Sequence, residues 1–248
     1  MYPVGRSGLL RWLKTAFLVA AFILLVFNFH WLEQLAPALF ARRGIMIERV
    51  PLPVSAWQHI YLVSISSFLS ILCAVFLGTI AFFPFARDFK ELFVDLSSLG
   101  ETFPSVAIIA LTVPVLGYGF WPTLLALYIY GILPVLRNTI TGIENIDPGV
   151  MDAASGMGMS TGEVLVKVAL PLALPVILAG IRTSVIINIG AATIGATVGA
   201  GGFGVPIISG IRSYDIALIL RGSIPVALLA VAADSLFSNL EAIFEARR

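Results

Sequence analysis

Residues 152–171, DAASGMGMSTGEVLVKVALP, concentrate polar groups in a chain that has few of them. The segment holds two acids, one lysine, three glycines and several hydroxyl groups, whereas 59% of the 248 residues are hydrophobic and only 12% are charged. A polar, glycine-spaced segment of this kind suits the docking of another protein, or a solvated connection between two hydrophobic spans. The residues alone leave both alternatives open.

Local signals predict two short helices in and just before this segment. Asp147-Pro148 is typical of a helix start, because an aspartate N-cap accepts hydrogen bonds from free backbone N–H groups and proline fits the first turn. Ser160 and Glu163 have the spacing of a capping box, in which each side chain satisfies the other residue's backbone donor. The small side chains of residues 153–154 leave a helix surface that another protein can approach closely.

Other kinds of chemistry are disfavoured. Residues 199–204 (GAGGFG) match the G-x-G-x-x-G pattern, but they follow a hydrophobic span instead of a strand, so they predict a turn and not a nucleotide site. No G-x-x-x-x-G-K-[ST] motif occurs, so no phosphate cradle for ATP is expected in this chain. With two histidines and the single Cys73, the sequence predicts neither a metal site nor an internal disulfide.

The composition predicts an all-α polytopic membrane protein. Soluble domains carry roughly 25% charged residues, about twice the fraction found here, and the mean hydropathy is +1.00. A bilayer core of about 30 Å requires about 20 apolar residues per helix. We expect about six transmembrane helices, near residues 15–32, 59–85, 101–117, 121–137, 171–197 and 218–239.

These spans divide the chain into three parts. Residues 1–57 form an N-terminal membrane helix and a periplasmic connection, residues 58–239 form the transmembrane domain, and residues 240–248 form a cytoplasmic tail. An uncleaved first helix is favoured over a signal peptide with a cleavage site at residues 36–38. With the N-terminus inside, nine basic residues flank the spans on the inner side and five lie on the outer side, which favours a cytoplasmic N-terminus and C-terminus.

Ionisable and amide side chains inside the spans are costly in lipid and need a role. Arg182 forms either a buried structural pair or a pore-lining charge, and the structural alternative is favoured. Asn188 either lines the pore or bridges helices by a hydrogen bond. The side chains of Arg221 and Asp234 are expected to extend along the helix, so that their charged groups reach the membrane–water interface.

The polar segment resembles the EAA motif of type I ABC importer permeases that work with binding proteins. The residues that carry the resemblance are Asp152, Ala153, Ala154, Gly158, Val168, Leu170 and Pro171. The family has Glu-Ala-Ala at the start and Ile before Leu-Pro, so this chain differs conservatively at Asp152 and Val168. The resemblance implies that residues 147–170 dock on an ATPase subunit and couple its closure to the membrane helices.

A narrower resemblance covers residues 58–238. Stretches such as TFPSVAIIALTVPVLGYGFWP and LPLALPVILAGIRTSVIINIGAATIGATVGAGGFG are similar to osmoprotectant permeases, which import glycine betaine, choline and carnitine. The resemblance implies a five-helix core preceded by one extra N-terminal helix. It also implies a second permease subunit, identical or homologous, a dimer of ATPase subunits that bind ATP and Mg, a periplasmic solute-binding protein, and a bacterial inner membrane location. No cofactor is expected in this subunit.

Three alternatives remain at this point. The cargo could be another small solute, such as an amino acid, a polyamine or a sulfonate. An ion-coupled secondary transporter would need a central carboxylate and an internal repeat, but Asp234 is the only acid clearly within a span and lies near its end. A membrane scaffold that binds a soluble partner is disfavoured by the EAA spacing.

Aromatic rings could hold a quaternary ammonium group, but none is assigned to a substrate site.

Overall fold

The computed structural model describes residues 6–35, 50–86, 89–102 and 104–245. Within these ranges every regular element is a helix, which confirms the predicted all-α class. The α-helices, in chain order, are α1 (Arg6–Phe27), α2 (Phe29–Leu35), α3 (Leu52–Ile80), α4 (Phe89–Thr102), α5 (Ser105–Leu116), α6 (Phe120–Glu144), α7 (Pro148–Gly156), α8 (Thr161–Val164), α9 (Leu170–Ala191), α10 (Gly204–Ser213) and α11 (Ile216–Glu245). Three further helical turns are Pro84–Ala86 (3-10), Leu165–Ala169 (π) and Ala192–Val198 (3-10).

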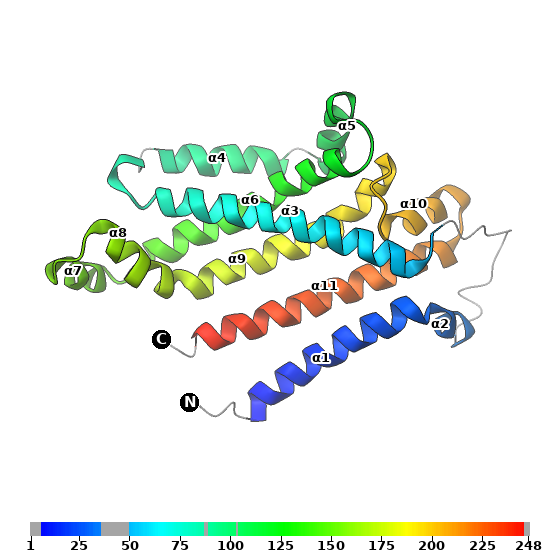
Figure 1. Ribbon diagram of the computed structural model, residues 1–248, viewed down its shortest axis with the longest axis horizontal. Coiled ribbons are helices and arrows are strands. Elements are labelled where there is room, and N and C mark those ends of the chain that lie inside the picture. The colour runs from blue at the N-terminus through cyan, green and yellow to red at the C-terminus, as the bar shows by residue number, and fades with distance from the viewer. Residues whose placement is uncertain (1–5, 36–49, 87–88, 103, 246–248) are drawn as a thin grey trace.

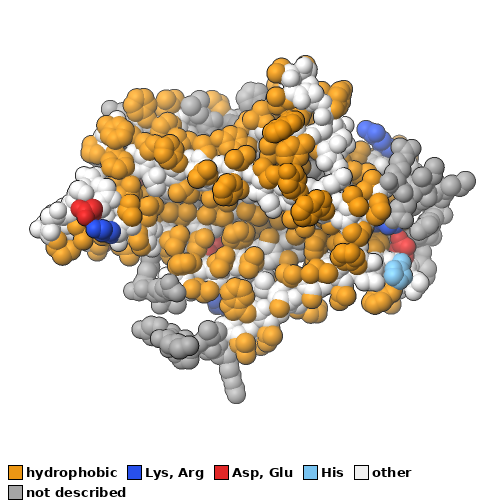
Figure 2. Space-filling model, viewed as in Figure 1, with side chains coloured by type: hydrophobic (Ala, Val, Ile, Leu, Met, Phe, Trp, Pro, Cys, Tyr) orange, Lys and Arg blue, Asp and Glu red, His pale blue; other side chains and the backbone are white. Residues whose placement is uncertain are grey.

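Five helical stretches in the described part are long and apolar enough to cross a bilayer. They are Gly8–Phe27, Leu52–Ile80, Phe120–Glu144, Thr161–Val198 and Ile216–Glu245. Figure 1 shows them running along the long axis of the molecule, with the start of α1 and the end of α11 at the same end as α7 and α8. Figure 2 shows hydrophobic side chains over most of the visible face, as expected for a surface in contact with lipid tails.

The structure differs from the sequence prediction at residues 101–117. The apolar helix there, α5, has only 12 residues, or about 18 Å at 1.5 Å per residue, so it is too short to cross the bilayer alone. Pro104 precedes α5 in an extended conformation (φ −57°, ψ 133°). Its ring removes the backbone N–H that a continuous helix would need, so α5 begins as a separate helix after it. The charged stretch before it forms α4, an amphipathic helix that the sequence analysis does not predict.

Helix boundaries also differ from the prediction. Helix α3 begins at Leu52, directly after Pro51, and therefore includes several residues assigned to the N-terminal part. Helix α11 continues to Glu245, so most of the predicted tail is helical. Residues 36–38, where the disfavoured signal peptide would be cleaved, and the last three residues of the tail lie outside the described residues.

Small and hydroxyl residues let α3, α6 and α9 pack closely in the centre of the bundle. A Cβ atom added at Gly131 would lie 2.6 Å from Ser70 Oγ and 2.9 Å from Ser184 Oγ. The Ser70 hydroxyl donates to the Tyr128 carbonyl, and the Ser184 hydroxyl donates to the Gly131 carbonyl, each at 2.8 Å. Close backbone approach and interhelical hydrogen bonds are what hold membrane helices together, because lipid tails are as apolar as leucine.

The N-terminal helix is attached to α11 by polar contacts. The hydroxyls of Thr15 and Ser235 lie 2.7 Å apart, and the Asn239 amide donates to Thr15 Oγ1 at 2.8 Å. Further along, Arg221 Nη1 lies 3.6 Å from Glu33 Oε1 on α2. Arg221 is therefore paired within the protein, where the sequence predicts extension to an interface.

Candidate coupling site

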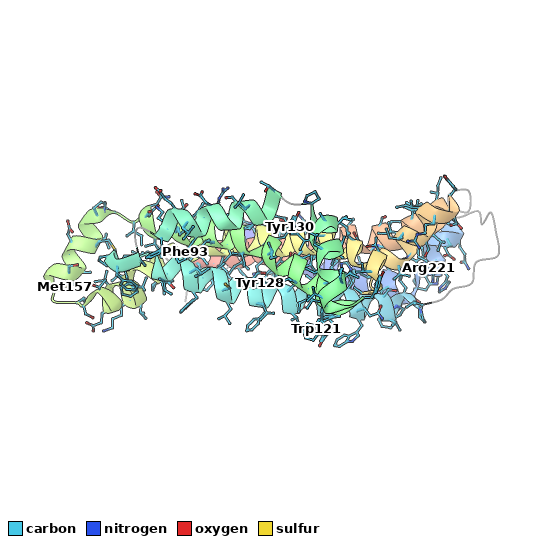
Figure 3. The ribbon with its side chains drawn as sticks, turned by 90° about the horizontal axis from the view of Figure 1, so that it is seen from above. Phe93, Trp121, Tyr128, Tyr130, Met157 and Arg221 are labelled. Carbon is cyan, nitrogen blue, oxygen red and sulfur yellow. The ribbon has the colours of Figure 1, made fainter. Side chains whose placement is uncertain are left out.

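Residues 147–170, here called the coupling segment, form a helix–turn–helix at one end of the bundle. The segment starts as predicted, with Asp147 as N-cap and Pro148 as the first residue of α7. The backbone N–H of Gly149 donates to Asp147 Oδ1 at 2.7 Å. Figure 3 shows Met157, in the turn after α7, at the extreme tip of this end. The segment therefore presents the turn and its flanking helices outward.

Gly158 makes the turn between the two arms of the coupling segment. Its φ is +85°, a backbone conformation in which side chains other than glycine are strained. A Cβ atom added there would meet nothing within 4 Å. The EAA glycine is therefore required here by backbone conformation and not by lack of space.

The second arm is held by the predicted capping box. The backbone N–H of Ser160 donates to Glu163 Oε2 at 3.0 Å, and the backbone N–H of Glu163 donates to Ser160 Oγ at 3.4 Å. Lys167 Nζ donates to the other oxygen of Glu163 at 2.8 Å. Lys167, followed by Ser160, lowers the pKa of the Glu163 carboxyl to about 2. Glu163 is thus ionised at physiological pH, and its charge is balanced by Lys167.

A π-helical turn joins the coupling segment to α9 without a break. The backbone N–H of Leu170 donates to the carbonyl of Leu165, five residues back. The next residue, Pro171, has no N–H, and its ring would crowd the carbonyl four residues back, so the wider turn relieves this conflict. The helical stretch Thr161–Val198 has 38 residues, about 57 Å, whereas a bilayer core is about 30 Å. The stretch is therefore longer than the bilayer core is thick, and we place its first turns, which carry Glu163 and Lys167, outside the core.

Residues of the EAA motif from both arms face a common hollow of about 410 Å³. The hollow is lined by Asp147, Gly149, Val150, Ala153, Ala154, Met157 and Val168. Ala153 and Ala154 come from α7, and Val168 comes from the π-helical turn. The structure thus brings these three motif residues together, whereas the remaining four have other positions.

The remaining motif residues lie around this hollow. Asp152 and Gly158 are exposed, and Leu170-Pro171 begin α9. Met157 is not part of the motif, yet 72% of its surface is exposed at the edge of the hollow. The motif spacing does not predict the exposure of Met157. Its position between Gly156 and Gly158, in a glycine-flanked turn, does indicate an exposed side chain.

The inner side of the coupling segment is anchored in the bundle. Leu165 and Ala169 belong to one hydrophobic cluster with Ile143, Ala173 and Ile177 from α6 and α9. Apolar burial thus fixes one side of the segment, while the hollow and Asp152 remain accessible on the outside. A force applied to the outer side is therefore transmitted to α6 and α9.

The two other residues singled out in the spans contact neighbouring helices. Arg182 Nε donates to Asp234 Oδ1 at 2.7 Å, and Arg182 Nη1 donates to Glu241 Oε2 at 3.2 Å. This geometry supports the structural alternative for Arg182, and it places Asp234 in an ion pair instead of free at an interface. Asn188 is fully buried and donates to Ser67 Oγ at 3.1 Å, which supports the helix-bridging alternative.

Aromatic side chains cluster around the first turns of α3 and α6. Trp57 and Tyr61 of α3 have ring centroids 6.0 Å apart, Tyr61 lies 5.7 Å from Phe120, and Phe120 lies 5.4 Å from Trp121. Figure 3 shows Trp121 projecting from the edge of the molecule. The rings pack against each other, an arrangement typical of interfacial anchors. In the described ranges no three His, Cys, Asp or Glu side chains gather to hold a metal ion.

Comparison with known proteins identifies the family. Residues 68–248 match the family described as "Binding-protein-dependent transport system inner membrane component". The chain belongs to this family. This permease is 38% identical over 185 residues to the choline transport system permease protein OpuBB of Bacillus subtilis (strain 168), a match that covers 75% of this chain and 84% of that protein.

Two further relatives have similar coverage. The carnitine transport permease protein OpuCB of Listeria monocytogenes is 38% identical over 190 residues, which cover 76% of this permease and 85% of the relative. The osmoprotectant import permease protein OsmW of Salmonella typhimurium is 35% identical over 192 residues, which cover 75% and 88%. The predicted resemblance to osmoprotectant permeases is thus confirmed.

Solved structures confirm the predicted fold. The inward-facing MetNI methionine ABC transporter matches with a TM-score of 0.69 at 17% identity, covering 76% of this permease and 93% of that chain. An amino acid ABC transporter solved with histidines matches with a TM-score of 0.60 at 19% identity, covering 79% and 93%. The permease therefore has the type I ABC importer fold. It is a membrane-spanning transport subunit and not itself the catalytic one.

Proposed function

We propose that this permease imports glycine betaine or a related quaternary amine across the bacterial inner membrane, driven by ATP hydrolysis in a separate ATPase subunit. The observation that carries the proposal is the agreement among relatives. Permeases named for choline, carnitine and osmoprotectant transport share 35–38% identity with about three quarters of this chain. The cargo class rests on that agreement, since no aromatic ring is assigned to a substrate site.

The coupling segment is proposed to dock on the ATPase. Asp147 and Asp152 are exposed acids, whereas Glu163 is neutralised by Lys167, so the segment carries a net charge of about −2. We expect the ATPase surface to supply basic groups for these acids and an apolar side chain for the hollow beside Met157. Ala153 and Ala154 lack bulk that would hold the two proteins apart.

The proposed transport cycle follows from this docking. Two permease subunits enclose the pathway, and a solute-binding protein delivers the cargo at the outer side. When ATP closes the ATPase dimer, it draws the two coupling segments together and opens the pathway outward. Hydrolysis resets the inward-facing state. The unbroken helix from Thr161 to Val198 supports this account, because it can carry movement of the coupling segment across the membrane.

Uptake by cells that express this permease with its ATPase and binding protein tests the cargo. We expect uptake of labelled glycine betaine, choline or carnitine, and its loss when the ATPase is inactivated. An amino acid, a polyamine and a sulfonate serve as comparison cargoes. Uptake of one of these, with no uptake of any quaternary amine at low or high osmolarity, would overturn the proposed cargo.

A further inference from the structure

Arg182 on α9 lies between two carboxylates of α11. Its Nε and Nη2 atoms both lie 2.7 Å from Asp234 Oδ1, and its Nη1 lies 3.2 Å from Glu241 Oε2. Asp234 and Glu241 are seven residues apart, so they occupy one face of α11 two turns apart. The single guanidinium is thus divided between two acceptors.

One of the two carboxylates, that of Glu241, is not fully satisfied in this arrangement. An arginine pairs most strongly when it donates two parallel hydrogen bonds to the two oxygens of one carboxylate. Here both donors that face Asp234 reach the same oxygen, and Glu241 receives one bond. The second oxygen of Glu241 is buried and has no hydrogen-bond partner in the described part of the chain. The cluster holds one positive and two negative charges, so it contains an acceptor in excess.

The cluster lies where movement of the coupling segment reaches α11. Helix α9 continues directly from the coupling segment, and Arg182 lies 12 residues after Leu170, or about 18 Å along the helix. Helix α11 packs against α9, and it also contacts α1 and α10. A shift of α9 along its axis therefore has to be accommodated at the contact of Arg182 with α11.

We propose that Arg182, Asp234 and Glu241 form a two-position latch that couples movement of α9 to α11 during transport. Arg182 pairs mainly with Asp234 in one state and mainly with Glu241 in the other. The two acids are about 10.5 Å apart along α11, so a slide of a few ångströms exchanges the partner without leaving the arginine unpaired. These three side chains are thus positioning residues, and the inference rests on the proposed coupling role of residues 147–170.

Glu241→Gln in the complete transporter, reconstituted in proteoliposomes, tests the latch. With one position lost, the coupling segment moves without moving α11. We therefore expect basal ATPase activity to rise, and uptake to fall at least about fivefold, the lower end of coupling effects between sites. Glu245→Gln is the matched control, because Glu245 is an exposed carboxylate one turn further along α11, and it should change neither activity. If Glu241→Gln leaves both activities unchanged, or lowers both in proportion to the amount of assembled transporter, the latch is overturned.

A charge exchange separates a latch from a static brace. Arg182→Glu combined with Asp234→Arg rebuilds one ion pair with the same net charge, but it places the cation on the same helix as Glu241. The cation can no longer exchange partners as α9 moves. We expect normal assembly with the ATPase and low uptake; full uptake would overturn the proposal. Basal ATPase activity is measured without cargo, so the latch is tested even if the wild type takes up no quaternary amine.

Discussion

Gly158 is the residue at which the coupling segment depends most on backbone conformation. Its φ of +85° costs about 1–2 kcal/mol for a residue with a Cβ atom, although the space around it is open. We expect Gly158→Ala to destabilise the turn by this amount and to accelerate amide hydrogen exchange in α7 and α8 by about 5–30-fold.

Gly156→Ala is the matched control for that substitution. Gly156 also has open space around it, but it is the last residue of α7 and lacks a positive φ. Alanine favours a helix over glycine by up to about 1 kcal/mol, so exchange should stay equal or become slower. Equal acceleration by both substitutions would contradict the assigned role of Gly158.

Residue-scale features were predictable where their cause is local. The Asp147 cap and the Ser160–Glu163 capping box each involve residues within four positions, and both are present. The partners of Arg182 are 52 and 59 residues away, and only the packing of α9 on α11 brings them together. For this reason the sequence predicts that Asp234 extends to an interface, whereas the structure pairs it.

At the scale of elements, the π-helical turn sets how the coupling segment faces relative to α9. Pro171→Ala supplies the missing N–H and permits ordinary α-helical geometry. If the wide turn becomes an α-helical turn, the coupling segment rotates about the helix axis by about 100° relative to α9, the angle of one residue. We expect uptake to fall at least about fivefold while the ATPase still copurifies. Pro175→Ala is the comparison, since Pro175 lies inside regular α9; equal losses in both variants would rule out a specific role for the turn.

The attachment of α1 to α11 gives a second prediction about elements. Asn239→Ala removes the donor to Thr15, and interhelical hydrogen bonds in membranes contribute about 0.6–2 kcal/mol. We expect the unfolding free energy of the detergent-solubilised permease to fall by that amount. Asn28→Ala is the control, because Asn28 directly follows α1 and its side-chain amide donates to the Leu24 carbonyl of that helix, four residues back, and so does not bridge α1 to α11 in the hydrogen bond observed. Unchanged stability of Asn239→Ala would show that the contact does not hold α1.

Element lengths were less predictable than element types. The charge-free stretch around residues 102–136 predicts two spans, and the turn at residues 117–119 is present with positive φ at both glycines. Pro104, however, separates α4 from α5. Hydropathy averages over such a break, because it measures burial and not backbone hydrogen bonding.

At the scale of the whole molecule, the arrangement predicts the orientation in the membrane. The start of α1, the end of α11 and the coupling segment lie at one end (Figure 1). The turn at residues 117–119 lies at the start of α6, a helix of 25 residues or about 38 Å that separates it from the coupling segment. Alkaline phosphatase fused after Tyr118 should be active, since it folds only outside the cytoplasm, and a fusion after Met157 should be inactive. The reverse pattern would contradict an ATPase-facing coupling segment.

The account as a whole depends on Asp152, an exposed acid at the entrance to the proposed ATPase contact. The most direct measurement is uptake of labelled glycine betaine by cells with the complete transporter, comparing wild type, Asp152→Lys and Asp152→Glu. We expect Asp152→Lys to lower the rate of uptake at least about tenfold, equivalent to 1.4 kcal/mol, with an unchanged amount of permease in the membrane. Asp152→Glu keeps the charge and should retain uptake. Full uptake by Asp152→Lys would contradict the coupling role of the segment.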